Sequence, residues 1–438
     1  MINNKEFERY AAYKDSGIEW LGEVPECWEI TRNKDIFEER GCLSISGDEI
    51  LLTVSHITGV TRRTEKNVNM FMAETMEGYK LCKSGDLIIN TMWAWMGALG
   101  TANESGICSP AYGVYKPKKY TAYNHRFFDY LYRTPNAITE MTRNSKGIVS
   151  SRLRLYPKDF FQIKTALPTE IEQQAIADYL DIKTAQIDRK IDLLSQKSSL
   201  YSNFKQSLIN ETVTRGLDKT VPMKDSGVEW LGEIPAHWKV KRVKEVATVF
   251  NGATPKSSVI ENWDGELHWV TTDDLGKLNT KFITDTKRKI TAKGYASCGA
   301  TICPIGSVVI SGRAPIGHIG ILSIKASSNQ GCKTLVLNLK VANNLFVFYS
   351  LLSSKLKLEA LGRGTTFIEL STKELLLFNL SCPPLKEQQA IANYLDEKTA
   401  QIDQIIQTIN SQIDKLKELR KALINDVVTG KIKITGTQ

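Results

Sequence analysis

The side chains with the most definite chemistry in this chain are arginines, lysines and amides that follow short apolar runs. Arginine can donate two parallel hydrogen bonds to guanine, and asparagine or glutamine can bind adenine in a similar bidentate way. Serine, threonine and lysine suit phosphate oxygens. In the first half of the chain, the candidates for contacts of this kind are Arg62, Arg63, Lys66, Asn90, Thr91, Lys146, Arg152 and Arg154.

The second half carries a comparable set, which comprises Thr254, Lys256, Thr271, Thr272, Arg313, Asn329, Gln330, Lys333, Arg363 and Thr365. Polar residues are mostly exposed in any soluble protein, so a solvated surface position is the competing interpretation of each residue taken singly. Trp93 and Trp95 lie beside one candidate loop, and we interpret them as packing residues rather than as wedges between bases. The net charge of +9 favours a polyanionic partner, because lysine and arginine neutralise phosphates.

The motifs predict no catalytic site. The segment from Gly312 to His318 has the glycine spacing of a phosphate-binding loop, but a histidine stands where a lysine would have to reach the phosphates. A tight turn or a sheet edge is the better interpretation. Glu266, Asp273 and Asp274 lack the lysine that would complete a nuclease site. We interpret them as solvated loop carboxylates, a group that can also accept from a cytosine amino group.

Composition excludes several further classes of protein. The eight cysteines include no Cys-x-x-Cys pair and stand apart from the five histidines, so neither a zinc site nor a disulfide framework is predicted. No apolar run approaches the roughly 18 residues of a membrane span, and the N-terminus is too polar for a signal peptide. We therefore expect a cytoplasmic protein that holds no metal and no cofactor.

The elements that must position the candidate residues occur twice. Lys14 to Pro25 returns as Lys224 to Pro235 with only isoleucine and valine exchanged. Glu172 to Asp188 returns as Glu387 to Asp403 with 15 of 17 positions unchanged. A duplicated unit predicts internal pseudo-twofold symmetry, which suits a target that also has two halves.

Each repeat consists of a mixed segment and a helical one. Apolar runs such as Asp86 to Ile89 and Thr334 to Leu337, separated by turn residues, predict short strands of a twisted sheet. Helices are predicted at Phe127 to Tyr132 and at Asn344 to Leu361, so the fold class is α+β. The predicted mixed domains are residues 1–166 and 217–382, and the predicted helical segments are residues 167–216 and 383–438.

The helical segments carry the 4-3 spacing of a coiled-coil seam. The predicted seam residues are Ile187, Ile191, Leu194, Tyr201 and Leu208 in the first segment and Ile402, Ile406, Ile409, Ile413, Leu416, Leu423 and Val427 in the second. Lys205 and Arg420 occupy equivalent seam positions, where a charge can fix register or oppose self-association. The two helices are expected to pack as an antiparallel coiled coil. From Ile402 to Val427 the helix would extend about 39 Å, close to the roughly 34–36 Å of one turn of B-DNA.

Several motifs taken together resemble the specificity subunit of a Type I restriction-modification system. They are the tandem W-L-G-E-(V/I)-P-x-x-W element, the G-D-L-I-I-N-T-M-W-A-W-M-G run, the N-G-A-T-P-K and S-N-Q-G turns, and the doubled E-Q-Q-A-I-A-x-Y-L-D helix start that follows a proline. The resemblance covers essentially the whole chain. It implies that residues 1–166 and 217–382 are target-recognition domains, each reading half of a bipartite, asymmetric site in double-stranded DNA.

The same resemblance implies that the subunit is not catalytic. The paired helices would act as a spacer, and each half would recruit one methyltransferase subunit, giving two, with restriction subunits joining through the complex. Chemistry with S-adenosylmethionine and ATP would then lie on partner chains, so no cofactor is expected here. Two alternatives remain open: a coiled-coil scaffold that never contacts DNA, and a stand-alone nuclease or methyltransferase.

Overall fold

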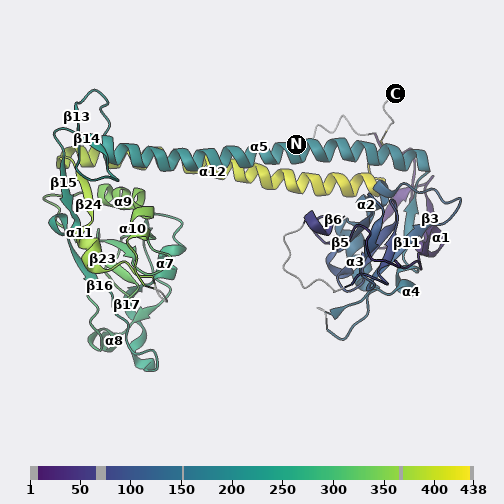
Figure 1. Cartoon of the computed structure of the whole chain (residues 1–438), viewed down its shortest axis with the longest axis horizontal. Helices are drawn as coiled ribbons and strands as arrows, with labels where there is room; N and C mark the ends of the chain where they lie inside the picture. Colours follow the sequence, from purple (N-terminus) through teal and green to yellow (C-terminus); the bar gives the residue numbers. More distant parts are fainter. Residues whose placement is uncertain (1–7, 66–74, 150–151, 365–367, 435–438) are drawn as a thin grey trace. The chain divides into compact units, whose positions relative to one another are not determined.

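The computed structural model divides the chain into two compact units, which are described separately (Figure 1). Unit 1 combines Met1–Ser195 with Ser411–Gln438, and unit 2 is Gln196–Asn410. The structure describes residues 8–65, 75–149, 152–364 and 368–434. Two of the candidate residues, Lys66 and Thr365, lie outside the described residues. Each unit contains one mixed domain together with part of each helical segment.

The central sheet of unit 1 is antiparallel and has the strand order β4 (Phe37–Glu39), β11 (Tyr112–Pro117), β8 (Leu87–Asn90), β9 (Leu99–Thr101). Strand β8 confirms the strand predicted from Asp86 to Ile89, and all four of its side chains are buried. The smaller antiparallel pairs are β1 (Tyr13–Asp15) with β2 (Glu23–Pro25), β3 (Glu29–Arg32) with β12 (Lys164–Leu167), β5 (Leu52–Ser55) with β6 (Gly59–Arg62), and β7 (Lys80–Cys82) with β10 (Gly106–Cys108). The shorter helices are α1 (Asn33–Ile36), α2 (His125–Tyr132), α3 (Pro135–Arg143) and α4 (Pro157–Phe160).

Unit 2 repeats this plan with additions. Its central sheet has the order β16 (Ala247–Asn251), β23 (Cys332–Leu337), β20 (Val308–Ser311), β21 (Ile319–Leu322), β18 (Phe282–Ile283). A second sheet has the order β19 (Lys289–Ile290), β17 (Trp263–Val270), β22 (Ala326–Ser328), and the paired strands are β13 (Met223–Asp225) with β14 (Glu233–Pro235) and β15 (Lys239–Arg242) with β24 (Asn379–Cys382). The shorter helices are α6 (Val243–Val246), α7 (Thr272–Gly276), α8 (Ala292–Ala296), α9 (Asn344–Ser353), α10 (Lys355–Ala360) and α11 (Thr372–Leu377).

The single helix predicted from Asn344 to Leu361 is wrong in one respect, because it is broken at Ser354. This residue ends α9 and begins α10. Its hydroxyl donates to the carbonyl of Ser350 at 2.7 Å. A serine that bonds to the preceding helical turn competes with the backbone and favours a break.

Two long helices, α5 (Glu170–Arg215) and α12 (Leu385–Val428), confirm the predicted helical segments. Both follow a proline junction, and both end at a glycine with a positive φ. At Gly216 φ is 76° and at Gly430 it is 77°, conformations that suit glycine because it has no Cβ. A Cβ on Gly430 would lie 2.4 Å from Cδ of Pro25, so close packing also excludes a larger residue there.

Helices α5 and α12 pack as an antiparallel pair within each unit. In unit 1, Nε of Arg420 lies 2.9 Å from Oδ1 of Asp188. In unit 2, Ser198 is hydrogen-bonded to Asn410 and Lys205 forms an ion pair with Asp403. The contact thus moves seven residues forward along α5 and seven residues back along α12, as it must when two helices are antiparallel. The predicted seam positions Ile402, Ile409, Ile413, Leu423 and Val427 are buried, and Ile187, Ile191, Leu194, Tyr201, Leu208, Ile406 and Leu416 are half-buried.

The repeated sequence motifs bond to one another in each unit. Nε1 of Trp28 donates to Glu172 at 3.1 Å, and Nε1 of Trp238 donates to Glu387 at 3.0 Å. Both tryptophans are fully buried, and a buried indole N–H needs an acceptor. The tryptophan element and the glutamate at the start of the long helix are therefore retained together in both copies.

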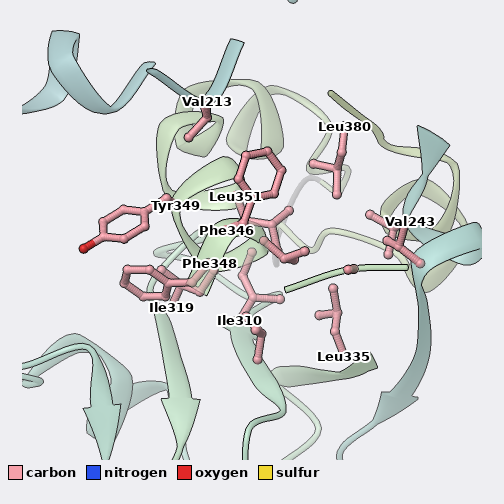
Figure 2. Close-up of a cluster of buried hydrophobic side chains, with 14 of the residues drawn as sticks. Val213, Val243, Ile310, Ile319, Leu335, Phe346, Phe348, Tyr349, Leu351 and Leu380 are labelled. Atoms are coloured by element: carbon pink, nitrogen blue, oxygen red, sulfur yellow. The ribbon is translucent and has the colours of Figure 1, made fainter. Parts of the chain in front are cut away.

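The core of each unit is completed by the far end of a long helix. In unit 2, Ile209 and Val213 of α5 are buried in the cluster that contains Trp238. Figure 2 shows Val213 among the side chains that include Phe346 and Leu380. In unit 1 the same place is taken by residues from the end of α12, namely Leu423, Val427 and Val428. No helix in the part of the chain that the structure describes is both long and apolar enough to cross a membrane.

Candidate functional site

A hollow of about 800 Å³ lies at one edge of the central sheet of unit 2. The register of the sheet brings together residues that line this hollow. Asn251 at the end of β16 pairs with Lys333 near the start of β23, and Ser311 at the end of β20 pairs with Cys332. Because these strands are antiparallel neighbours, the end of one meets the start of the next at the same edge. The candidate residues that line the hollow are Arg313, Gln330, Lys333 and Arg363.

Three of the cations that line this hollow pair with its two carboxylates. Nε of Arg313 lies 3.0 Å from Oε2 of Glu369, and Nζ of Lys333 lies 3.5 Å from Oε1 of the same carboxylate. Nε of Arg363 lies 2.7 Å from Oε1 of Glu374. The Lys333 side chain is only 5% exposed, whereas that of Arg363 is 84% exposed. The cluster therefore carries a net positive charge and presents both donors and acceptors to a ligand.

Other candidates of unit 2 support the same region. Thr254 donates to the carboxamide oxygen of Gln330. A Cβ on Gly331 would lie 3.0 Å from Thr272, 3.3 Å from Asn329 and 3.7 Å from Arg313, so this glycine lets the three side chains approach one another. Four residues of the second candidate set thus line the hollow, and Thr254, Thr272 and Asn329 lie close to residues of that lining or to the glycine beside it.

Thr271 and Lys256 are placed differently from the other candidates in unit 2. The Thr271 hydroxyl caps α7 by bonding to Asp274, which is a structural role. Lys256 is exposed, and it is absent from the residues that line the hollow. Asp273 pairs with Lys277, whose hydrogen bond lowers the pKa of that carboxyl group. Among the described residues, no group of histidines, cysteines and carboxylates could hold a metal ion.

Unit 1 has an equivalent edge with different side chains. The backbone N–H of Leu155 donates to Thr91 at 3.0 Å, just as Leu370 donates to Gly312 at 2.7 Å in unit 2. The bridge between Lys146 and Arg154 likewise corresponds to the bridge between Arg363 and Glu369. Lys146 is therefore the counterpart of Arg363, and Arg154 is the counterpart of Glu369.

The candidates of unit 1 differ in whether their side chains already bind another residue of the protein. Asn90 is buried and accepts a hydrogen bond from the backbone of Met92, so its carboxamide serves the turn. The Thr91 hydroxyl donates to the carbonyl of Ala111. Lys146 pairs with Asp159 at 2.8 Å. Arg152 and Arg154 are exposed and have no ion-pair partner among the described residues.

Arg62 and Arg63 belong to another loop, at the end of β6 and the start of the short helix Arg63–Glu65. Arg62 makes two hydrogen bonds of 2.6 Å to Glu104, and the nearby guanidinium lowers the pKa of that carboxyl group. The interpretation of Trp93 as a packing residue is wrong, since 51% of it is exposed. Trp95 is half-buried, and its indole N–H donates to the carbonyl of Met92.

Sequence reasoning missed Glu369 and Glu374. Cations and amides are the residue types that suit phosphates, guanine and adenine, so the candidates were of these types. Carboxylates were considered as acceptors from cytosine only in the loop at Asp273. Nothing local distinguishes Glu369, because its partners Arg313 and Lys333 are distant in the sequence. One sequence signal was available. Lys333 is the one charged residue of a mostly apolar strand, and a buried lysine there needs a carboxylate beside it.

Residues 235–415 match the family model described as the Type I restriction modification DNA specificity domain. The chain is also similar to the type I restriction enzyme MjaX specificity subunit of Methanocaldococcus jannaschii, with 24% identity over 443 aligned positions. The alignment covers 94% of this chain and 96% of that subunit. The chain is therefore similar to specificity subunits of Type I restriction-modification systems over almost its whole length.

Two further comparisons show the same similarity. The MjaIX specificity subunit of the same organism is 29% identical to this chain over 197 residues, which are 45% of each chain, so the match spans less than half of that relative. A chain solved in work on the complex assembly and conformational transition of the type I R-M system superposes with a TM-score of 0.71. It is 18% identical, and the superposition covers 92% of this chain and 98% of that chain. At this identity the likeness concerns the fold.

Proposed function

We propose that this chain is the specificity subunit of a Type I restriction-modification system and reads a bipartite, asymmetric site in double-stranded DNA, one half through the loop edge of each unit. The observation that carries the proposal is the equivalence of the two edges, which share backbone hydrogen bonds but differ in side chains. A shared backbone arrangement that carries different loop side chains suits two domains that recognise different DNA sequences. The cations of the unit 2 hollow suit guanine and phosphate oxygens, which are acceptors.

The proposal assigns no catalysis to this chain. Two methyltransferase subunits would dock on it, and restriction subunits would join through that complex and supply the ATP-dependent cleavage. The paired helices would set the spacing between the two half-sites. The assembled complex would act in the cytoplasm, where its substrate DNA is found.

Sequencing of methylated DNA from cells that carry the complete system tests this function. The subunit with residues 217–382 exchanged for those of a relative with another specificity should change one half of the methylated sequence and leave the other half unchanged. A change in both halves would contradict independent readers. Methylation or cleavage by the isolated chain would instead establish a stand-alone enzyme.

A triple substitution separates DNA reading from a scaffold role. Arg313→Ala, Lys333→Ala and Arg363→Ala together should weaken binding of the assembled complex to its site by about tenfold or more. A matched control removes the same charge at Lys325, Lys340 and Lys357, which are exposed in unit 2 and do not line the hollow. Unchanged binding by the first variant would favour a scaffold that does not contact DNA.

A further inference from the structure

Arg313 and Glu369 form a donor and acceptor pair at the rim of the unit 2 hollow. Their side chains are 43% and 34% exposed, so both are accessible to a ligand. Only Nε of Arg313 faces the carboxylate among the described contacts, which leaves the terminal nitrogens of the guanidinium available. One patch therefore offers several N–H donors immediately beside a carboxylate acceptor.

Lys333 holds this carboxylate from the interior. Its Nζ also donates to Oδ1 of Asn251 at 3.3 Å, and its side chain is almost fully buried. Burying a lysine is strongly destabilising unless the charge is paired, and apolar residues of similar size often stabilise a fold at least as well as a buried ion pair does. The buried lysine beneath an accessible carboxylate therefore indicates that function, rather than stability, requires Glu369 to be charged and held in this position.

Unit 1 lacks both members of this arrangement. Lys333 pairs with Ile310 in unit 2, and the residue at the same place in the unit 1 sheet is Gly113, which pairs with Ile89. The counterpart of Glu369 is Arg154. The buried cation and the carboxylate above it are therefore present together in one unit and absent together from the other. The charge at the rim changes sign while the backbone frame is kept.

A G·C base pair has the complementary pattern on its major-groove edge. Guanine presents the acceptors N7 and O6, and cytosine presents the N4 amino donor. Because O6 and N4 are hydrogen-bonded to each other within the pair, they lie about 3 Å apart. The Arg313 guanidinium and the Glu369 carboxylate are in direct contact, with 3.0 Å between Nε and Oε2, so a donor group and an acceptor group likewise lie side by side. An A·T pair also places an acceptor, thymine O4, beside a donor, adenine N6, so the discrimination comes from guanine N7, an acceptor that thymine replaces with its methyl group.

We propose that Arg313 and Glu369 together read one G·C pair in the half-site of unit 2, with Arg313 bound to guanine and Glu369 to the cytosine amino group. Lys333 is the positioning residue that fixes Glu369. The inference rests on the proposed DNA-reading function and adds a base identity to it. In unit 1, Arg154 presents a donor at the equivalent position, so that half-site has no cytosine contact there.

The test uses the complete complex and methylation sequencing of a plasmid library with randomised sites. With Glu369→Gln, discrimination for one G·C pair in one half-site should fall by about tenfold or more, and A·T should be accepted there, because a carboxamide suits adenine. The other half-site should stay unchanged. Glu359→Gln makes the same charge change elsewhere in unit 2 and should leave every position unchanged, since Glu359 lies on α10 outside the hollow.

A second measurement does not depend on the folding of the Glu369 variant. In binding assays with the wild-type complex, 7-deazaguanine at the assigned position removes the N7 acceptor and should weaken binding by about tenfold. With Arg313→Ala the same DNA change should have no further effect, which is the expectation for two groups in contact.

The outcomes distinguish the two proposals. If the wild-type complex methylates without any sequence preference, the proposed function fails. A normal bipartite preference that contains no G·C pair in the unit 2 half-site would overturn the G·C contact alone. Variants of Glu369 and Arg313 that leave every base preference intact would do the same.

Discussion

Nζ of Lys205 on α5 lies 2.6 Å from Oδ2 of Asp403 on α12. Asp188 and Asp403 end the two copies of the strict repeat, and Asp188 meets Arg420 in the same way. The two charged breaks in the apolar seam are therefore each paired with the partner helix. Such a pair opposes a shifted register, because a shift would leave the seam charge against apolar neighbours.

The Lys205–Asp403 pair should contribute little stability and much specificity. The Lys205 side chain is 29% exposed and that of Asp403 is 57% exposed, so solvent screens the pair and removing it should cost only about 0.5 kcal/mol. Lys205→Glu should destabilise the subunit by more, since two like charges then meet. Adding Asp403→Lys should restore most of the loss in urea unfolding. Lys197→Glu, at an exposed position without an ion-pair partner among the described residues, serves as the control. Equal effects at both positions would contradict a specific pairing.

Removal of residues 423–438 should unfold unit 1 and spare unit 2. The deletion takes Leu423, Val427 and Val428 out of the unit 1 core, each contributing about 1.5–3 kcal/mol. Their sum approaches the whole stability of a typical domain, about 5–15 kcal/mol. Hydrogen exchange should therefore rise in the mixed domain of unit 1, while the mixed domain of unit 2 stays protected.

The control for this truncation ends the chain at Ile434 and keeps the three core residues. It should retain normal exchange in both units. Continued protection of unit 1 after the longer deletion would show that the end of α12 is not needed for its core.

The contact between Trp238 and Glu387 depends on an acceptor rather than on charge. Glu387→Gln keeps an oxygen for the indole N–H and should cost less than about 1 kcal/mol, whereas Glu387→Leu leaves a buried donor unpaired and should cost about 1–3 kcal/mol. Thermal or urea unfolding measures the difference. Glu418→Leu, at an exposed position of α12, should be nearly neutral. A glutamine variant as unstable as the leucine variant would point to the charge, including the nearby His237, instead.

The buried thiols of unit 2 should make stability fall in alkali. Burial raises the pKa of Cys303 from 9.0 to about 11 and that of Cys332 from 9.0 to about 12. The unfolded state loses these protons first, so the stabilisation is complete below pH 9 and is lost as pH rises through 9 toward 11. The melting temperature should drop over this window, and less so for Cys303→Ala once its neutral-pH stability is subtracted.

The same burial predicts how the cysteines react. At pH 8 a thiol-specific alkylating reagent should modify the exposed Cys27 and Cys42 and leave Cys303 and Cys332 unmodified until the protein unfolds. Mass spectrometry of the labelled peptides reports this directly. Equal labelling of Cys42 and Cys303 in the folded protein would contradict the burial of the latter.

Arg154→Ala should weaken DNA binding by the complex through unit 1 only. The side chain is exposed and has no ion-pair partner among the described residues, so its loss does not disturb the fold. If it contacts a phosphate, the slope of log affinity against log salt should decrease by about one, and if it contacts a base, one position of one half-site should relax. Lys158→Ala, also exposed in unit 1, tests for a general effect of charge. A loss confined to the other half-site would contradict the assignment.

Much of the fold follows from local patterns. The 4-3 spacing and the proline junctions predict α5 and α12, because helix periodicity and helix starts depend on residues a few positions apart. Alternation with turn residues likewise predicts β8 and β23. The candidate cations Arg313 and Arg363 were identified from residue type and loop position, whereas Lys333, which lies in β23, was identified from residue type alone.

The duplication, the α+β composition, the seam of the long helices and the cationic loops follow from the order of residues along the chain. That the end of α12 completes the core of unit 1, and that Glu369 lies between Arg313 and Lys333, could be learned only from the folded chain. These contacts join residues far apart along the chain. They depend on how β16, β23 and β20 align at one edge of the sheet and on which apolar surfaces meet. The hydrophobic effect is non-directional, so a short stretch of sequence does not specify which apolar surfaces will pack together.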